Sequence, residues 1–196
     1  MIIQTDPRDW QILADGSAMQ REAFEVMSAL RIFEVLAQYK PAHVGTIGNG
    51  LCIEGSDIDI VCSAPQLDAF ELYVERAFGH LMSFTIVQSI SRGAPNVVAS
   101  FQSTLPVEIY CESTPVEEQL GFRHYALTCR LFTVAGEELL QSVRLLKGSG
   151  MKTEPALARC LGFEGDPYLS LLKVEEMGDA EVAEFLACAP YLLGEL

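Results

Sequence analysis

Residues 45–59 read Gly-Thr-Ile-Gly-Asn-Gly-Leu-Cys-Ile-Glu-Gly-Ser-Asp-Ile-Asp, a glycine-rich turn followed by two carboxylates one residue apart. If the residues after Ser56 form a strand, Asp57 and Asp59 share one face, and Ile58 and Ile60 lie on the opposite, buried face. Mg²⁺ prefers carboxylate oxygens and substrate phosphates, and the N–H groups of a glycine-rich turn approach phosphates closely. The stretch therefore predicts a phosphate-binding turn beside a metal site.

A third carboxylate, Glu108, alternates with Val107 and Ile109 in another strand-like segment. Three carboxylates on one sheet face raise one another's pKa, so their gathering favours a bound cation over three free charges. Such a trio has room for two Mg²⁺ ions and predicts phosphoryl or nucleotidyl transfer. Taken alone, Asp57 and Asp59 are equally typical of a solvated turn, and Glu108 is typical of an exposed strand position.

The hydrophobic pattern predicts an α/β (α+β) fold in which a mixed sheet is flanked by helices and followed by an all-helical C-terminal part. The expected helices of the first part are 19–39 and 67–81, and its expected strands are 43–47, 57–63, 83–89, 96–102 and 106–111. Beyond Pro115 we expect helices over 116–146, with a break near Gly136, then 154–161 after a Thr153 cap, and 179–188. We expect two parts, 1–115 and 116–196, packed together with any cleft at their junction.

Composition narrows the class of protein. The chain has 196 residues, 49% of them hydrophobic, which is enough for a substantial core. Its net charge of −14 argues against nucleic-acid binding and favours a cationic partner, or serves solubility alone. Neither a signal peptide nor a membrane-spanning run is evident, so we expect a cytoplasmic protein without membrane contact. The six scattered cysteines form no C-x-x-C pair and indicate buried, reduced thiols.

The order of Gly45-Thr46, Ser56-Asp57-Ile58-Asp59 and Glu108 resembles the pattern of the nucleotidyltransferase superfamily over about the first two thirds of the chain. The resemblance implies a minimal nucleotidyltransferase-type sheet. More narrowly, the chain resembles a bacterial family catalogued as a domain of unknown function, which implies a fold and no established substrate. The residues that carry this second resemblance are Gly45–Ile47, Ser56–Ile60, Gln119, Arg123-His124, Lys147, Lys152–Ala156 and Gly165–Tyr168.

The superfamily resemblance assigns roles to six residues, and three cations of the helical half are further candidates because that half is expected to face the cleft. The expected catalytic residues and metal ligands are Asp57, Asp59 and Glu108, and the expected phosphate-binding residues are Gly45, Thr46, Ser56, Arg123, Lys147 and Lys152. The last three are included because Asn49 stands where many active members have a basic residue, so phosphate charge must be met elsewhere. His124 is either a base or substrate contact, or a hydrogen-bonded interface histidine.

The resemblance implies a Mg²⁺-dependent enzyme that moves a nucleoside monophosphate from a nucleoside triphosphate to a hydroxyl of a small molecule or protein. The alternative is a catalytically silent module of the same fold that binds a nucleotide or a protein partner. A purely structural protein would bind neither nucleotide nor metal and would expose an apolar patch instead. The sequence predicts no oligomeric state.

Overall fold

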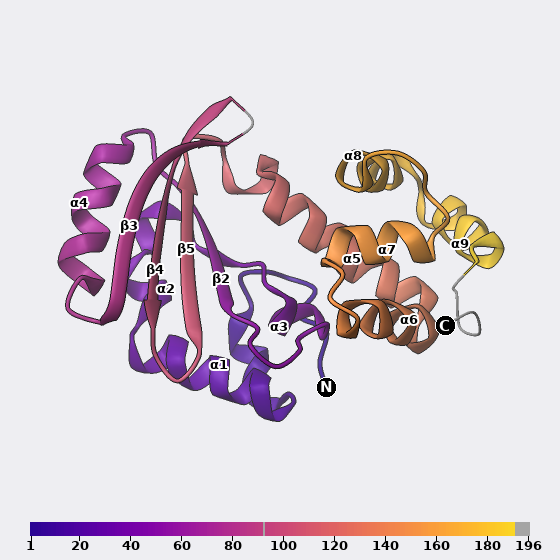
Figure 1. Ribbon diagram of the computed structural model, residues 1–196, viewed down its shortest axis with the longest axis horizontal. Coiled ribbons are helices and arrows are strands. Elements are labelled where there is room, and N and C mark those ends of the chain that lie inside the picture. The colour runs from indigo at the N-terminus through magenta and orange to yellow at the C-terminus, as the bar shows by residue number, and fades with distance from the viewer. Residues whose placement is uncertain (92, 191–196) are drawn as a thin grey trace. The chain divides into compact units, whose positions relative to one another are not determined.

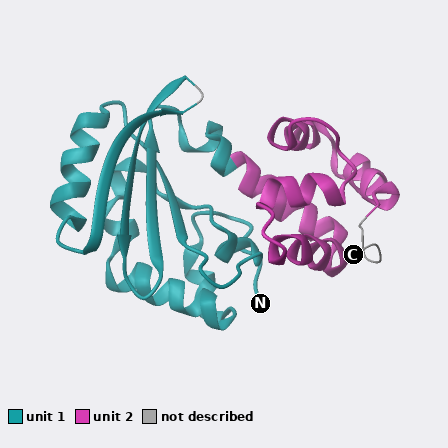
Figure 2. Ribbon diagram, in the orientation of Figure 1, with its two compact units in different colours: residues 1–122 teal, residues 123–196 magenta. Residues whose placement is uncertain are grey.

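A computed structural model describes residues 1–91 and 93–190, which form two compact units (Figure 2). Unit 1 comprises Met1–Phe122 and unit 2 comprises Arg123–Leu196. The boundary between the units lies within helix α5 (Leu120–Ala135), which begins in unit 1 and continues into unit 2. Our division into separate domains after residue 115 remains a prediction.

Unit 1 contains one mixed sheet of five strands in the order β1-β2-β5-β4-β3 (Figure 1). Strands β2 and β5 are parallel, and the other neighbouring pairs are antiparallel. The strands are β1 (Ala42–His43), β2 (Ile58–Ser63), β3 (Met82–Ser91), β4 (Ala94–Gln102) and β5 (Pro106–Glu112). The helices are η1 (Trp10–Asp15), α1 (Ala18–Ala29), α2 (Ile32–Val35), η2 (Ala37–Tyr39), α3 (Thr46–Asn49), α4 (Leu67–Phe78) and η3 (Val116–Glu118), where η denotes a 3-10 helix.

One face of this sheet packs on the core. Ile60 of β2 and Ile109 of β5 are buried there together with Phe70 and Val74 of α4. The alternation of the strands places polar and partly exposed residues on the opposite face, among them Glu108. The sheet therefore has one apolar and one largely polar face, as the period-2 pattern of the sequence predicts.

Two predicted elements of unit 1 are shorter than expected. The helix predicted over 19–39 is divided into α1, α2 and η2. Arg31, with a left-handed φ of 51°, separates α1 from α2, and Lys40, with a φ of 53°, follows the end of η2. The strand predicted over 43–47 ends at His43, and Thr46–Asn49 forms the single helical turn α3 instead. The chain must reverse between the antiparallel strands β1 and β2, and α3 lies within the connection that makes this reversal.

Unit 2 is helical, as the sequence predicts. Its helices are α5, which starts at Leu120, α6 (Glu137–Gly148), α7 (Thr153–Cys160), α8 (Pro167–Leu172), η4 (Lys173–Glu176) and α9 (Asp179–Cys188). The predicted break lies at Gly136, whose φ of +71° separates α5 from α6. Helix α7 starts at Thr153, one residue earlier than predicted, and α8 is a helix that we did not predict.

Two further expectations concern the whole chain. Among the described residues, no helix combines the length and the apolarity that crossing a bilayer requires. All six cysteines are free, and Cys62, Cys111, Cys129 and Cys160 are buried, as predicted. Cys188 is exposed and Cys52 is partly exposed, so the prediction of buried thiols fails at these two positions.

His43 makes the stability of unit 1 depend on pH. Its ring is fully buried, Nδ1 lies 2.8 Å from Gln4 Oε1, and Nε2 has no hydrogen-bond partner. Burial lowers the pKa of His43 to about 4. The unfolded chain, in which the pKa is about 6.5, binds the extra proton first, so acid favours unfolding between these two values.

Protonation of His43 should lower the free energy of unfolding by up to about 3 kcal/mol between pH 6.5 and pH 4. His43→Gln removes this contribution, so its urea-unfolding free energies at pH 7, 5 and 4 should decline less than those of the wild type. His80→Gln, at an exposed position, is the control and should retain the wild-type decline. Equal declines in all three proteins would contradict the prediction.

Candidate functional site

Two of the predicted carboxylates lie side by side on the sheet. Asp59 of β2 is the Cα partner of Glu108 of β5, and the two strands are parallel. Paired residues on neighbouring strands project from the same face, so both carboxylates leave the face opposite to the buried Ile58 and Val107. The alternation of acidic and apolar residues in both segments thus positions the pair.

Asp57 and Glu108 line one pocket on this side of the sheet. The pocket has a volume of about 220 Å³, and its lining also includes Ser83, Ser100 and Gln102. Burial raises the pKa of Glu108, and the nearby charge of Asp57 raises it further. The structure therefore brings these two carboxylates close enough together to repel each other.

Gly45 allows the carboxylate of Asp59 to lie against the backbone of the turn. A Cβ atom at residue 45 would be 2.5 Å from Asp59 Oδ2, which is closer than real Cβ contacts. Any side chain at this position would therefore force Asp59 to move. The close approach explains why a glycine stands before Thr46, and it joins the predicted turn to the predicted acidic pair.

The two predicted hydroxyl residues lie together in the loop between β1 and β2. Thr46 Oγ1 and Ser56 Oγ are 3.3 Å apart, and Ser56 Oγ also accepts a hydrogen bond of 3.0 Å from the Ile53 N–H. Asn49 is buried, and its Oδ1 accepts a hydrogen bond from the Leu51 N–H. These side chains give the loop a fixed shape beside Asp59.

The N-terminal segment and α1 are hydrogen-bonded to the same turn. The Gln4 N–H donates to the Gly48 carbonyl at 2.8 Å. The buried Gln20 amide donates to the carbonyl of Ile47 at 2.9 Å and to that of Ile2 at 2.6 Å. The chain segment before α1 is thereby attached to α3 by hydrogen bonds on two sides.

The three predicted metal ligands are close together only in pairs: Asp59 is beside Glu108, and Asp57 shares a pocket with Glu108. Within the described part of the chain, no three His, Cys, Asp or Glu side chains lie close enough together to bind one metal ion. The donors present are carboxylate oxygens, the type that Mg²⁺ prefers, and a divalent cation would relieve the repulsion between Asp57 and Glu108. The chemistry of these residues fits a magnesium ion.

The three predicted phosphate-binding cations lie in unit 2, and each has different surroundings. Arg123 pairs with Glu175 through two nitrogens, with Nε–Oε2 at 3.1 Å and Nη2–Oε2 at 2.5 Å. Lys147 is buried, and its Nζ donates to Thr153 Oγ1 at 2.8 Å. Lys152 is exposed and stands immediately before α7. Thr153 thus contacts Lys147 and is not the cap that we predicted.

His124 lies within unit 2 as a buried, hydrogen-bonded residue. Its Nε2 is 3.0 Å from the Tyr168 carbonyl oxygen, and its Nδ1 is 3.9 Å from Glu154 Oε1. The ring therefore links α5 with α7 and α8. Of the two alternatives for this residue, the geometry in unit 2 is that of a structural histidine.

Sequence reasoning missed Ser83, Ser100 and Gln102, which share the pocket with the carboxylates. Ser100 is the Cα partner of Glu108 across β4 and β5. The alternation of polar residues in β4 was a usable signal, because Ser100 and Gln102 are separated by the buried Phe101. The approach of β3 to the same pocket had no such local signal.

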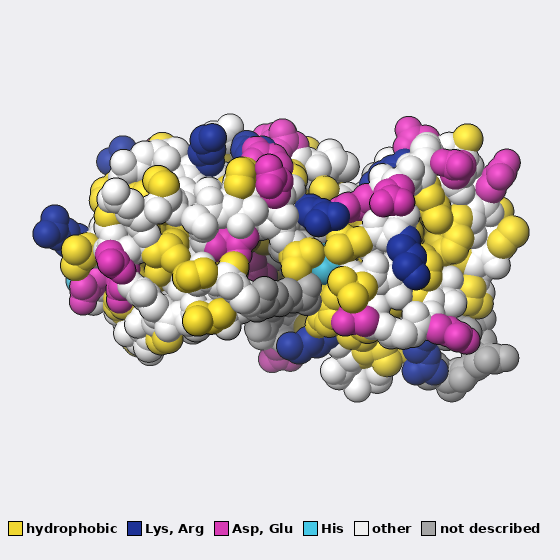
Figure 3. All heavy atoms as spheres, turned by 90° about the horizontal axis from the view of Figure 1, so that it is seen from above, with side chains coloured by type: hydrophobic (Ala, Val, Ile, Leu, Met, Phe, Trp, Pro, Cys, Tyr) yellow, Lys and Arg dark blue, Asp and Glu magenta, His cyan; other side chains and the backbone are white. Residues whose placement is uncertain are grey.

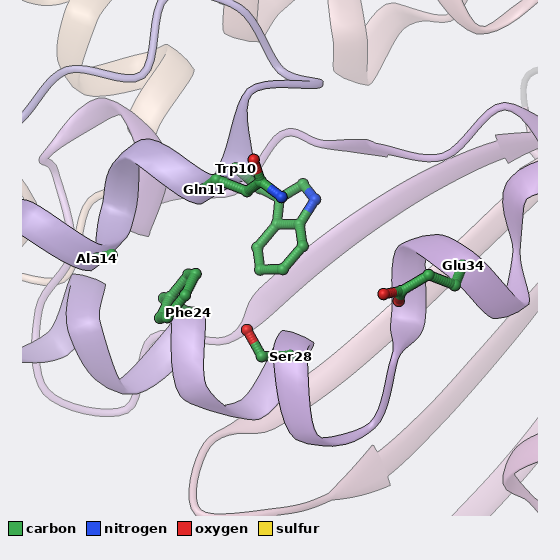
Figure 4. Close-up of a pocket in the computed structure, with 6 residues that line it drawn as sticks. All are labelled: Trp10, Gln11, Ala14, Phe24, Ser28 and Glu34. Atoms are coloured by element: carbon green, nitrogen blue, oxygen red, sulfur yellow. The ribbon is translucent and has the colours of Figure 1, made fainter.

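A second pocket, of about 360 Å³, lies elsewhere in unit 1 (Figure 4). It is lined by Trp10, Gln11, Ala14, Phe24, Ser28 and Glu34. Trp10 stacks on Phe24 and Phe33 at centroid distances of 5.5 Å and 5.1 Å. None of the predicted site residues lines this pocket, so the candidate site is the smaller pocket beside Glu108.

Comparison with solved structures supports the fold. The chain is similar to Cid1, an RNA terminal uridylyl transferase, with 16% identity and a TM-score of 0.51, covering 79% of this chain and 48% of Cid1. A MgGTP-bound structure of the Cid1 poly(U) polymerase gives 14% identity and a TM-score of 0.53, with coverages of 84% and 53%. The chain thus spans about half the length of Cid1.

The GLD-2/RNP-8 complex gives a TM-score of 0.55 at 12% identity, covering 92% of this chain and 81% of the matched chain. At such identities the similarity shows a nucleotidyltransferase fold and nothing finer. No curated protein sequence matches the chain. A family model does match it over residues 25–174. The chain therefore belongs to the family described as Domain of unknown function (DUF4269).

Proposed function

We propose that the protein is a Mg²⁺-dependent nucleotidyltransferase that moves a nucleoside monophosphate from a nucleoside triphosphate to a hydroxyl group. One observation carries this proposal: carboxylates from β2 and β5 meet on one sheet face, beside a turn in which a Cβ atom at Gly45 would collide with Asp59. The shared fold of the solved nucleotidyltransferases supports it. Fold alone does not fix a function, so the proposal depends on the site.

Asp57, Asp59 and Glu108 would hold one or two magnesium ions. When bound, Mg²⁺ supplies positive charge to the triphosphate and lowers the pKa of an attacking hydroxyl. The protein's own contribution is to place three carboxylates at the ends of two adjacent strands, where the apolar core behind them fixes the backbone. The pKa of Glu108 is raised by burial and further by the charge of Asp57, which supports this role because a bound divalent cation would offset both effects.

Gly45, Thr46 and Ser56 would hold the phosphates through backbone N–H groups and hydroxyls. Arg123, Lys147 and Lys152 would add positive charge from unit 2. Arg123 has its charge engaged by Glu175, so phosphate binding by Arg123 requires that ion pair to open. Lys152 is exposed and carries no such requirement.

The acceptor in this proposal is a hydroxyl of a small molecule or of a protein. The charge of −14 disfavours a nucleic acid, and on the visible face of each unit in Figure 3 the Lys and Arg side chains stand apart from one another. The similar structure of Cid1 is that of an RNA terminal uridylyl transferase, so the fold itself does not support excluding RNA. The exclusion rests on charge alone. We also propose a cytoplasmic location, which the six free cysteines support.

The second candidate is a catalytically silent module that binds a nucleotide or a protein partner. The observation that favours it is the absence, among residues 1–91 and 93–190, of three metal-ligating side chains at binding distance. The buried Asn49 adds to it, because its amide closes the turn and supplies no charge for a phosphate. Triphosphate binding that does not require Mg²⁺ would distinguish this candidate from the enzyme.

Calorimetric titration of ATP, GTP, CTP and UTP, with and without Mg²⁺, tests the metal site. We expect at least one triphosphate to bind in the presence of Mg²⁺ only. We expect Asp57→Ala to weaken this binding at least about tenfold, which corresponds to 1.4 kcal/mol. Asp15→Ala removes an exposed charge outside the site and should bind like the wild type. Absence of binding for all four triphosphates would refute the metal-dependent nucleotide site.

Asp59→Asn tests catalysis separately from folding. We expect pyrophosphate release to fall at least about 100-fold, because the variant loses a carboxylate that would hold the magnesium ion at the reacting phosphate. The free energy of unfolding should be unchanged or higher, since one of several crowded charges is removed. Asp15→Asn is the matched control. Equal turnover in Asp59→Asn and the wild type would exclude the proposed mechanism.

A further inference from the structure

The pocket beside Glu108 has a second, uncharged side. Ser83 of β3 and Ser100 and Gln102 of β4 line it, so these residues lie on the side of β5 away from β2. The glycine turn, by contrast, connects β1 with β2 and lies on the other side of the carboxylates. The strand order therefore places a phosphate-binding turn and a polar pocket on opposite sides of Asp59 and Glu108.

We infer that this pocket binds the acceptor, and that the acceptor is a small polyhydroxyl compound without a phosphate group. This inference rests on the proposed function and adds the class of the second substrate. The placement suits in-line displacement, in which the attacking hydroxyl and the leaving group stand on opposite sides of the reacting phosphorus.

The chemistry of the lining selects for hydroxyl groups. Ser83 and Ser100 each offer a hydroxyl that donates and accepts hydrogen bonds, and Gln102 offers an amide that does both. Among the described lining residues there is no Lys or Arg, while Asp57 and Glu108 supply negative charge. In the absence of Mg²⁺ these carboxylates would repel a phosphate group, and no Lys or Arg in the described lining would hold one when the metal is bound. The hydroxyls of a neutral polyol match both the hydroxyls and the amide of the lining.

The size of the pocket agrees with this class. Its volume of about 220 Å³ is below the range of roughly 300–1,000 Å³ that drug-sized ligands occupy. A compound with a single six-membered ring is therefore the appropriate scale. The partly exposed Pro106, which is on the same face of β5 as Glu108, offers apolar surface for the carbon face of such a ring.

The backbone of Ser83 is an independent indication that this position is used. Ser83 has a φ of 56°, in the left-handed region that favours glycine, and it lies where the register between β3 and β4 shifts. Arg31 and Lys40 share this conformation, at 51° and 53°, but neither lines the pocket. At Ser83 the unfavourable conformation holds a hydroxyl at the pocket, where a glycine would hold none.

The reaction balances without a further reactant. The acceptor oxygen forms a bond to the α-phosphorus, and the bond from the α-phosphorus to the bridging oxygen breaks. Pyrophosphate leaves with that electron pair, and the proton of the acceptor hydroxyl passes to water. The product is a phosphodiester between the nucleoside monophosphate and the polyol.

Saturation-transfer NMR with myo-inositol and with myo-inositol 1-phosphate tests the inference in the absence of Mg²⁺ and nucleotide. We expect myo-inositol to bind the wild type at millimolar concentration and the phosphate to bind more weakly. Ser83→Gly should weaken myo-inositol binding about five- to tenfold, the loss expected for one hydrogen bond. Its thermal stability should equal or exceed that of the wild type, because glycine relieves the left-handed strain.

Arg31→Gly and Lys40→Gly are matched controls, since both relieve the same strain outside the pocket, and they should bind myo-inositol like the wild type. Ser100→Ala should also weaken binding, whereas Ser63→Ala, on the same sheet face outside the pocket, should not. The inference is overturned if myo-inositol does not bind, if its phosphate or an RNA oligonucleotide binds more tightly, or if the controls lose binding equally. Failure of the nucleotide site would instead appear as absent triphosphate binding with myo-inositol binding intact.

Discussion

The parallel pairing of β2 with β5 is the constraint on which the rest of unit 1 depends. These two strands are far apart in the sequence, and their register makes Asp59 the partner of Glu108 while Ile58 is the partner of Val107. A shift of one residue would turn the carboxylates into the core and the apolar side chains outward. The burial of Ile58, Ile60, Val107 and Ile109 therefore fixes the register, and the register fixes the position of the acidic pair.

The two faces of the sheet have different roles: one stabilises the fold through hydrophobic burial, and the other carries the side chains of the candidate site. The core face packs on helices and contains no charged residue from β2 or β5. The other face carries like charges that repel one another. The fold tolerates this repulsion because the stabilising free energy of hydrophobic burial on the core face is larger. Residues such as Ser83 show the same pattern, since an unfavourable backbone conformation persists beside the pocket. The site is therefore a place where local stability is lower than the fold could provide.

The sequence predicted the parts of this arrangement that depend on short-range pattern. Strand periodicity placed Asp59 and Glu108 on a common face, and Gly136 correctly marked the break between two helices. Features that depend on how distant segments pair could not be predicted from the sequence. The irregular pairing at Met82–Thr85, which brings Ser83 to the pocket, arises from how β3 meets β4 and has no local signature. At Asp166-Pro167 a signal was present that we did not use, because an aspartate cap followed by proline is a typical helix start.

The attachment of the N-terminal segment to the glycine turn has a practical meaning for anyone who purifies this protein. Gln4 and Ile2 are hydrogen-bonded to the turn and to Gln20, and the Met1 side chain lies against Gly50. An affinity tag or a cleavage remnant fused ahead of Met1 would begin within a few residues of the loop that carries Thr46. Preparations that differ only in that leader are therefore not interchangeable for ligand screening.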